Sequence, residues 1–413
     1  MKVIVPGELS ERFFEFIEDN RNADYTRLLL SGKKDILTPE ELNFAIVQIR
    51  GRKSLKGKID ALLQNPKFLI PDLLVGEQST NHLVASYNAA VAKGGLSLAD
   101  LTAGLGIDSM AFAKNVKHVT SVEKDPFRAE ILSYNLRLFG ISNVEVINDD
   151  AEEFLKRTTS IFDVIYIDPS RRSNSGGRVF LLKDCVPDVE AIYPLLQKRC
   201  RRLLIKASPL LDLDDTVRSL PGIKTFHIVE FKHECKEILI EINWDEEKRA
   251  YPLIKCVNIL ENGDYNIYEI NKDKIFTSKT ADIQSILPNS FIYEPSPSVL
   301  KSGFSDSVMN MSETLRKLDT DTHLYVSEVE IPAFPGRSFK IEKVLDKKTL
   351  KSLKNEHLNV ISRNHPLRAD QIFKKYSILP GADRYIIAGR VAGKPLMMLA
   401  TMIETRFSRG LMK

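Results

Sequence analysis

The pattern of apolar and polar residues changes three times along the 413-residue chain. Residues 8–93 show helical periodicity with little sign of strands. The stretch LTPEELNFAIVQIRGR is typical, because Thr38 can cap a helix, Pro39 suits its first position and Glu41 can complete a capping box. The pattern predicts a helical N-terminal module over residues 1–75.

From Leu96 onwards, short apolar runs alternate with longer helical segments. Seven runs have the length and composition of strands, and they are LSLADLT, HVTSVEK, VEVIND, FDVIYIDP, RRLLIKA, KTFHIVEF and EILIEI. Strands that alternate with helices indicate crossover connections and a parallel sheet covered on both faces. The short spacer KHECK between the last two runs favours an antiparallel, hairpin-like end to this sheet. We therefore expect an α/β domain over residues 76–245.

Beyond Trp244 the regular alternation stops. Residues 246–330 mix the apolar runs LIKCVNIL, YNIYEI and HLYVSEVE with one helical run, DSVMNMSETLRKL, which predicts a small α+β module. The segment AFPGRSFK contains two Pro/Gly breaks and marks a further boundary near residue 331. Residues 331–413 alternate basic helices with short strands and form the last predicted domain.

The composition predicts the cellular compartment and argues against some classes of protein. The N-terminal residues lack a cationic segment followed by an apolar core, and no run of about 18 apolar residues occurs, which predicts a cytoplasmic protein without a membrane span. The cysteines are widely spaced and form no CxxC pair. We therefore expect reduced, structural thiols and neither a disulfide framework nor a metal site.

The net charge of +4 is unevenly distributed. Residues 337–413 contain 17 Lys and Arg against 6 Asp and Glu, a net +11, which leaves −7 for residues 1–336. Basic charge concentrated in one domain is typical of proteins that bind a polyanion, although a solvated surface gives the same count.

A glycine loop follows the first predicted strand, in DLTAGLGIDSMAFA. Gly104 and Gly106 have no Cβ, so the backbone there can turn tightly and approach a ligand. The second strand ends in Glu123, about 20 residues further on, where a carboxylate can accept both hydroxyls of a ribose. The third strand ends at Asp149 and Asp150, where a carboxylate can reach an adenine amino group.

Two nucleotide ligands compete for this loop. A dinucleotide fingerprint needs a third glycine where the chain has Ser109, and the carboxylates of Asp100 and Asp108 would repel a pyrophosphate. S-adenosylmethionine (SAM) has a cationic amino acid end, a ribose and an adenine, and the three strand ends offer partners in that order. A structural alternative, in which the carboxylates cap helices, explains any one of them more readily than three in register.

The fourth predicted strand ends in VIYIDPSRRSNSGGR, where Asp168 and Pro169 break an apolar run. At the carboxyl edge of a parallel sheet, Asp168 would lie beside the glycine loop, where ligands bind in open α/β folds. It could accept a hydrogen bond from an exocyclic amine and direct its lone pair at a methyl carbon, while Pro169 fixes the turn. Arg171 and Arg172 suit a polynucleotide or another anionic substrate, because guanidinium groups stack on bases and pair with phosphates.

These motifs resemble those of the class I SAM-dependent methyltransferases. DLTAGLGID resembles motif I, Glu123 the ribose-binding acid of motif II, Asp150 the adenine contact of motif III, IDPSRR the catalytic motif IV, and EQSTNHLVASYNAAV the motif X helix. The resemblance implies a Rossmann-like seven-stranded core with SAM as cofactor. It implies these cofactor-binding residues: Glu77, Thr80, Asp100, Thr102, Gly104, Gly106, Asp108, Glu123, Asp149 and Asp150. It implies these catalytic residues: Asp168, Pro169, Ser170 and Arg171.

Motif IV departs from the pattern of amino methyltransferases that act on nucleic acids. Those enzymes commonly have D/N-P-P-Y or D/N-P-P-F, whose aromatic ring stacks on a flipped base, whereas this chain has Ser170 and Arg171 in the last two positions. Carbon methylation of uracil would need a cysteine nucleophile, and the fifth strand, in LLIKASPLLDL, offers Lys206 and Ser208 instead. The residue that would stack on a base is therefore unassigned.

The overall layout resembles a bacterial family of class I methyltransferases with a C-terminal ferredoxin-like module and a THUMP-like domain. FIYEPSPSVLKSG, IPAFPGRSFK and ISRNHPLRAD carry this likeness, which extends with IDPSRR over residues 75 to about 400. It implies a ferredoxin-like module at 246–330 and a THUMP-like domain at 331–413, as in tRNA-modifying enzymes that grip RNA. The residues expected to contact substrate or RNA are Arg172, Lys206, Arg337, Arg363, Arg368 and Arg384.

These observations predict an α/β enzyme with an N-terminal helical module and C-terminal α+β domains. Its predicted function is that of a SAM-dependent methyltransferase of structured RNA, tRNA before rRNA, in which Asp168 presents a base amine and the tail domain holds the RNA. One alternative keeps SAM and replaces the substrate by a protein or a small anionic metabolite. Another is a non-catalytic RNA-binding protein with a vestigial SAM pocket.

Overall fold

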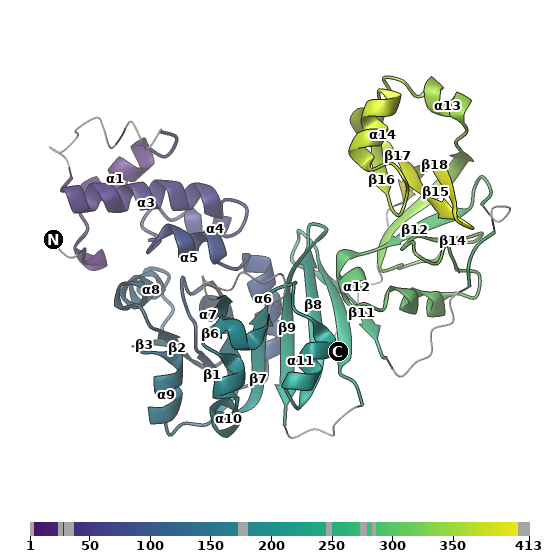
Figure 1. Cartoon of the computed structure of the whole chain (residues 1–413). Coiled ribbons are helices and arrows are strands. Elements are labelled where there is room, and N and C mark those ends of the chain that lie inside the picture. Colours follow the sequence, from purple (N-terminus) through teal and green to yellow (C-terminus); the bar gives the residue numbers. More distant parts are fainter. Residues whose placement is uncertain are drawn as a thin grey trace. The chain divides into compact units, whose positions relative to one another are not determined.

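The computed structural model describes residues 4–23, 28, 37–171, 181–244, 250–272, 279–282 and 286–403, with the side chain of Arg171 excepted. The chain divides into two compact units (Figure 1). The first comprises Met1–Thr225 and Ile238–Arg249, and the second comprises Phe226–Glu237 and Ala250–Lys413. The boundaries of the four predicted domains stay predictions.

Helices make up the described part of the N-terminal module, as the periodicity predicts. Their bounds are η1 (Pro6–Glu8), α1 (Glu11–Asp19), α3 (Pro39–Leu55), α4 (Asp60–Leu63) and α5 (Leu73–Gln78). The predicted capping box at the start of α3 is confirmed. The amide of Glu41 donates to Thr38 Oγ1 at 3.2 Å, and the amide of Thr38 donates to Glu41 Oε2 at 2.8 Å.

Two buried side-chain amides bind the backbone of adjacent residues of this module, one from within the module and one from the α/β part of the first unit. The backbone of Ile70 donates to and accepts from Gln48 of α3, both at 2.8 Å. The backbone of Leu69 does the same with Asn135 of α8 (Pro126–Leu138), at 3.0 and 2.8 Å. Both amide side chains are fully buried. Because buried backbone groups need partners, these four bonds stabilise the segment between α3 and α8.

All seven predicted strands of the α/β domain are present. They are β1 (Ser97–Asp100), β2 (His118–Glu123), β3 (Val144–Asn148), β4 (Phe162–Ile167), β7 (Cys200–Ala207), β8 (Ile223–Phe231) and β9 (Glu234–Asn243). Within the first unit the strand order is β3-β2-β1-β4-β7-β9, parallel except for the antiparallel pair of β7 and β9. The parallel sheet and its antiparallel end are therefore as predicted, and the α/β fold class is confirmed.

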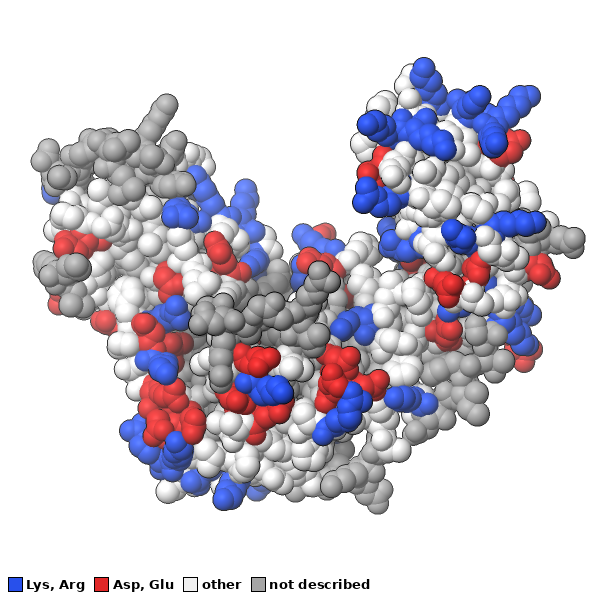
Figure 2. Space-filling model, viewed as in Figure 1, with Lys and Arg blue, Asp and Glu red and all other residues white. Residues whose placement is uncertain are grey.

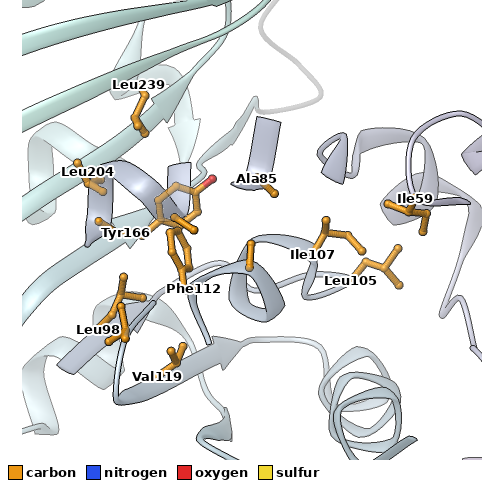
Figure 3. Close-up of a cluster of buried hydrophobic side chains, with 14 of the residues drawn as sticks. Ile59, Ala85, Leu98, Leu105, Ile107, Phe112, Val119, Tyr166, Leu204 and Leu239 are labelled. Atoms are coloured by element: carbon orange, nitrogen blue, oxygen red, sulfur yellow. The ribbon is translucent and has the colours of Figure 1, made fainter. Parts of the chain in front are cut away.

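A helix precedes the first of these strands, and further helices and a short ladder connect the others. The helices are α6 (His82–Ala92), α7 (Ile107–Phe112), α8, α9 (Ala151–Arg157), α10 (Val189–Arg199), η2 (Leu182–Asp184) and α11 (Leu213–Ser219), and the ladder pairs β5 (Ser170–Arg171) with β6 (Cys185–Val186). Apolar residues from β1, β2, β4 and α7 form the core beneath the glycine loop (Figure 3). The rings of Phe112 and Tyr166 meet edge to face at its centre, 4.9 Å between centroids.

The second unit contains two sets of strands. Strand β8 is followed in one sheet by β10 (Leu253–Ile259) and then β11 (Tyr265–Ile270). The other sheet has the order β13-β14-β12-β15-β18-β17-β16. Its strands are β12 (Phe291–Pro295), β13 (Arg316–Lys317), β14 (Tyr325–Ser327), β15 (Gly336–Val344), β16 (His357–Ser362), β17 (Leu379–Val391) and β18 (Lys394–Ile403). Strands from both predicted C-terminal domains therefore share this sheet.

Four short helices accompany this sheet in the described residues, and they are α12 (Pro297–Lys301), η4 (Ser305–Met311), α13 (Lys347–Ser352) and α14 (Ala369–Tyr376). The helix predicted for DSVMNMSETLRKL is wrong beyond Met311. The amide of Thr314 donates to Ser312 Oγ at 3.2 Å, and β13 follows directly. Such local side-chain bonds compete with helix formation. Within the described residues, none of the helices combines the length and the apolar character needed to span a membrane.

Candidate cofactor and catalytic site

The glycine loop joins β1 to α7 and depends on two backbone conformations. Gly104 has a φ of +54° and Gly106 a φ of +82°, which side chains with a Cβ rarely adopt. A Cβ on Gly106 would also lie 2.1 Å from Cδ1 of Leu132 on α8. Glycine at position 106 therefore allows both the turn and the close approach of α8.

The Glu123 carboxylate is fixed beside this loop at the carboxyl end of β2. Its Oε2 accepts from the Gly104 amide and its Oε1 from the Asp125 amide, both at 2.9 Å. A carboxylate has about four acceptor sites. Each oxygen can therefore still accept a ligand hydroxyl, and the structure brings together the two predicted residues Gly104 and Glu123.

Asp100 lies below the loop and holds it from inside. Its carboxylate accepts from the Thr102 amide at 3.2 Å and from Ser109 Oγ at 2.5 Å, and Ser121 Oγ donates to Ser109 Oγ at 2.8 Å. Burial, partly opposed by the Ser109 hydrogen bond, raises the pKa of Asp100 to about 7. Ser109, which the motif comparison treats as a missing glycine, thus has a structural role.

A hydrogen-bond chain connects α7 to the end of β4. Thr80 Oγ1 donates to Asp108 Oδ2 at 2.6 Å and accepts from Lys206 Nζ at 2.8 Å. Lys206 Nζ also donates to Asp168 Oδ2 at 2.6 Å. Four predicted residues, two of them from the ends of β4 and β7, therefore meet in one cluster.

The position of Asp168 itself depends on Thr102, because the Asp168 amide donates to Thr102 Oγ1 at 2.7 Å. Burial raises the pKa of the Asp168 carboxyl, and the Lys206 ammonium opposes this shift. Pro169 is buried, and Ser170 is exposed at the start of the short strand β5. The side chain of Arg171 and all of Arg172 lie outside the described residues.

The two acids after β3 are engaged within the protein. Asp150 caps α9 by accepting from the Glu152 amide at 2.9 Å, and it pairs with Lys124 Nζ at 3.0 Å. Partial burial raises the pKa of Asp150, but Lys124 and the helix amides lower it overall. Asp149 pairs with Arg157. Their predicted contact with adenine stays a prediction.

Asn88 of α6 is a further polar residue of this cluster that sequence reasoning did not single out. Its Nδ2 donates to Asp108 Oδ1 at 3.3 Å, and its side chain is fully buried. It lies within EQSTNHLVASYNAAV, the stretch that resembles the motif X helix, and a buried asparagine in the middle of an apolar helix is an unusual choice of residue. Glu77, by contrast, has an exposed side chain on α5.

Three family models match parts of the chain. Residues 88–178 match the family "Conserved hypothetical protein 95", residues 291–335 a ferredoxin-like domain, and residues 336–402 a THUMP-like domain. A crystal structure described as a candidate methyltransferase from Porphyromonas gingivalis W83 is similar over nearly the whole chain. It is 26% identical, covers 95% of this chain and 98% of its own, and superimposes with a TM-score of 0.81.

The chain combines a methyltransferase-type α/β domain with ferredoxin-like and THUMP-like regions. The resemblance noted in the sequence is thereby confirmed. A tRNA (guanine(26)-N(2))-dimethyltransferase of Methanosphaera stadtmanae is 36% identical over 77 residues, or 18% of this chain and 20% of its own length. A ribosomal RNA small subunit methyltransferase J of Francisella philomiragia is 38% identical over 82 residues, or 18% and 34%. The chain thus spans a fifth to a third of these curated relatives.

Four of the arginines predicted to contact RNA lie among the described residues of the second unit, and each of them has an acidic partner. Arg337 and Arg363 both pair with the buried carboxylate of Glu294, the latter at 2.7 Å. Arg384 pairs with two glutamates at 3.1 and 3.3 Å, and the exposed Arg368 lies 3.4 Å from an aspartate. Lysines and arginines gather over α13 and α14 of the THUMP-like region (Figure 2). An RNA contact by any of them stays a prediction.

The charges around the loop suit a cationic ligand better than an anion. The carboxylates of Asp100, Asp108 and Asp168 interact electrostatically, and the described residues place the Lys206 ammonium among them. Negative charge therefore exceeds positive charge in this cluster, which fits the ammonium and sulfonium groups of SAM. No group of His, Cys, Asp and Glu side chains within the described ranges could hold a metal ion.

Proposed function

We propose that the protein is a SAM-dependent methyltransferase that acts on a base amine in structured RNA, tRNA before rRNA. One observation carries this proposal. At the carboxyl edge of one parallel sheet, three features lie at the ends of neighbouring strands: the glycine loop after β1, Glu123 as the last residue of β2 and Asp168 after β4. Ligands of open α/β sheets bind at this edge, so a nucleoside and a substrate could meet there.

The residues present fit SAM at the level of donor and acceptor chemistry. Glu123 would accept the ribose hydroxyls, and the acidic cluster around Asp108 would attract the cationic amino acid end. When bound, SAM would supply a methyl group on a sulfonium, which needs no metal or reductant. The protein would then have to bind the cofactor, exclude water and place the nucleophile in line with the methyl carbon.

Asp168 is our candidate for placing that nucleophile. Its Oδ2 is bonded to Lys206, and its backbone is fixed by Thr102. An ionised Asp168 can accept an N–H bond from an amine through its other carboxylate oxygen and so orient the nitrogen lone pair. Pro169, Ser170 and Arg171 would shape the substrate side, and Arg172 would contact an anionic part of the substrate.

Three features besides the residues of the candidate site support RNA as the substrate. The curated relatives quoted above are named as a tRNA and an rRNA methyltransferase. A THUMP-like region follows the ferredoxin-like one. Residues 337–413 carry a net +11, which favours binding to a polyanion.

The proposal can be tested on RNA isolated from cells. Mass spectrometry of tRNA and rRNA nucleosides from a deletion strain should reveal one missing methylated base, which returns with the wild-type gene and not with Asp168→Ala. Calorimetry should show SAM affinity within a few fold of wild type for Asp168→Ala, because Asp168 acts on the substrate. A wild-type protein that binds no SAM would refute the proposal.

Salt dependence separates an RNA substrate from a small anionic metabolite or a protein. Affinity for total tRNA should fall steeply between 50 and 200 mM salt, by a factor on the order of 10³ if six phosphates are contacted. A methylated small molecule or protein, together with tRNA binding that ignores salt, would contradict the choice of RNA.

A further inference from the structure

The ammonium group of Lys206 lies between two acids of the candidate site. Its Nζ is 2.6 Å from Asp168 Oδ2 and 3.9 Å from Asp108 Oδ2. Lys206 Nζ also donates a hydrogen bond to Thr80 Oγ1 at 2.8 Å, and the Thr80 hydroxyl donates in turn to Asp108. A single cation therefore connects the cofactor side of the cluster, on α7, to the substrate side, at the end of β4.

This geometry does not suit a lysine that binds RNA phosphates. The Lys206 side chain is 12% exposed, and its ammonium already donates to two oxygens inside the protein. A phosphate would have to displace these charge-assisted bonds within a largely buried cluster. Lysines that bind polynucleotides by charge are typically exposed, as a mobile point charge on a flexible stem.

We propose that Lys206 is a positioning residue that keeps the Asp168 carboxylate ionised and oriented, and that it does not contact the RNA. The proposal rests on the proposed methyltransferase function, within which it changes the role that the sequence assigns to Lys206. Its basis is the direct Lys206–Asp168 bond together with the anchoring of the same ammonium by Thr80 and Asp108.

The electrostatic surroundings of Asp168 explain why a cation is needed there. The charged groups that face it in the described residues are Lys206 on β7, Asp108 on α7 and Asp100 on β1. Burial and the Asp108 charge raise the pKa of Asp168, and Lys206 opposes both. Without the ammonium, Asp168 would hold a proton to higher pH. A protonated carboxyl would donate to the amine lone pair and block it, whereas the ionised form accepts an N–H bond.

The hydrogen bond to Thr80 fixes the position of the Lys206 ammonium group relative to Asp168. Because Thr80 Oγ1 donates to Asp108, the lone pair of this hydroxyl is presented to Lys206. The ammonium is thereby held on the side of Asp168 that carries Oδ2. The other oxygen of this carboxylate, Oδ1, would then accept one N–H bond from the substrate amine. This single bond would give the amine one orientation.

The test compares Lys206→Met, Lys206→Gln and Lys206→Arg with a matched control, Lys198→Met, which removes an exposed lysine from the end of α10. Proteins labelled with ¹³C at the aspartate carboxyl are titrated by NMR without any ligand, and Asp168→Asn assigns the signal. The pKa of Asp168 should rise by about one unit or more in the Met and Gln variants, since an opposite charge at this range lowers a carboxyl pKa by about 1–3 units. Lys206→Arg and the control should leave it near the wild-type value.

Activity and binding provide two further readouts. With saturating SAM and total tRNA, the acidic limb of the kcat profile should move up by about one pH unit or more in Lys206→Met, and Lys206→Arg should restore its position. The sign follows from the raised pKa, because the active, ionised form then requires higher pH. The Kd for tRNA should change less than about twofold in every variant, since the lysine contacts no phosphate.

Opposite outcomes identify which idea has failed. An unchanged Asp168 pKa in both Lys206→Met and Lys206→Gln overturns the positioning role. Weaker tRNA binding with a salt slope reduced by about one unit would make Lys206 a phosphate contact. Absence of SAM binding by the wild-type protein would refute the methyltransferase function, while the ligand-free titration would still report on the Lys206–Asp168 pair.

Discussion

Replacing Gly106 by alanine should destabilise the first unit more than the same replacement at a turn glycine of this unit whose new methyl group meets no neighbour. Gly106 is the residue before α7, its φ is +82°, and the new Cβ would lie 2.1 Å from Cδ1 of Leu132. Leu132 is fully buried on α8 and belongs to a small core cluster under the loop. The substitution therefore combines backbone strain with overpacking.

The two contributions can be estimated separately. A left-handed backbone conformation costs an L-residue about 1–2 kcal/mol relative to glycine. Overpacking of a well-filled core costs typically about 1–3 kcal/mol, because Leu132 has to leave its rotamer or α8 has to shift. The free energy of unfolding should thus fall by about 2–5 kcal/mol.

A second glycine isolates the backbone contribution. Gly140 has a φ of +66°, and a Cβ built there meets nothing within 4 Å. Gly140→Ala should therefore lose only about 1–2 kcal/mol. The assay is urea unfolding followed by the fluorescence of Trp244, the single tryptophan of the chain, which packs against Tyr193 in the first unit. Equal losses for the two variants would refute the claim that Leu132 requires glycine at position 106.

Two further predictions concern the site and its support. Glu123→Ala should weaken SAM binding at least about tenfold in calorimetry, because hydrogen bonds to a charged group contribute about 1.5–3 kcal/mol each, whereas the exposed Glu145→Ala should not; equal affinities would remove Glu123 from the site. Asn135→Ala should lower the free energy of unfolding by about 2–5 kcal/mol in the Trp244 assay, since it leaves the buried N–H and C=O of Leu69 without these bonds. A loss below about 1 kcal/mol would show that water or a backbone shift replaces them.

The α/β part of the fold could be predicted because its signals are local. Each strand is a short apolar run between turn residues, and each of the acids Asp100, Glu123 and Asp168 stands at the end of such a run. In a parallel sheet, strand ends converge at one edge, so sequence position alone places these residues near each other. The capping box at Thr38 is equally local, as both of its bonds span three residues.

Contacts between distant segments could not be predicted in the same way. Lys206 is 126 residues from Thr80 and 38 from Asp168 in sequence, and nothing near it marks which partner it meets. From sequence, Lys206 is therefore only grouped with the residues expected to contact substrate or RNA, and its partners are not predicted. The pairing of Arg337 and Arg363 with Glu294 is hidden for the same reason, because it joins three segments of the second unit.

The acids at the strand ends also differ in the hydrogen-bonding capacity that they still have for a ligand. Their positions in the sequence do not reveal this difference. Asp150 is committed to the amides at the start of α9 and to Lys124, so a ligand would compete with a helix cap. Glu123 instead uses its bonds to hold the amides of Gly104, in the glycine loop, and of Asp125, in the turn between β2 and α8. These two hydrogen bonds orient the Glu123 carboxylate and leave each of its oxygens able to accept a further hydrogen bond. Carboxylates at equivalent strand ends therefore differ, and the hydrogen bonds support a ribose contact at Glu123 more strongly than an adenine contact at Asp150.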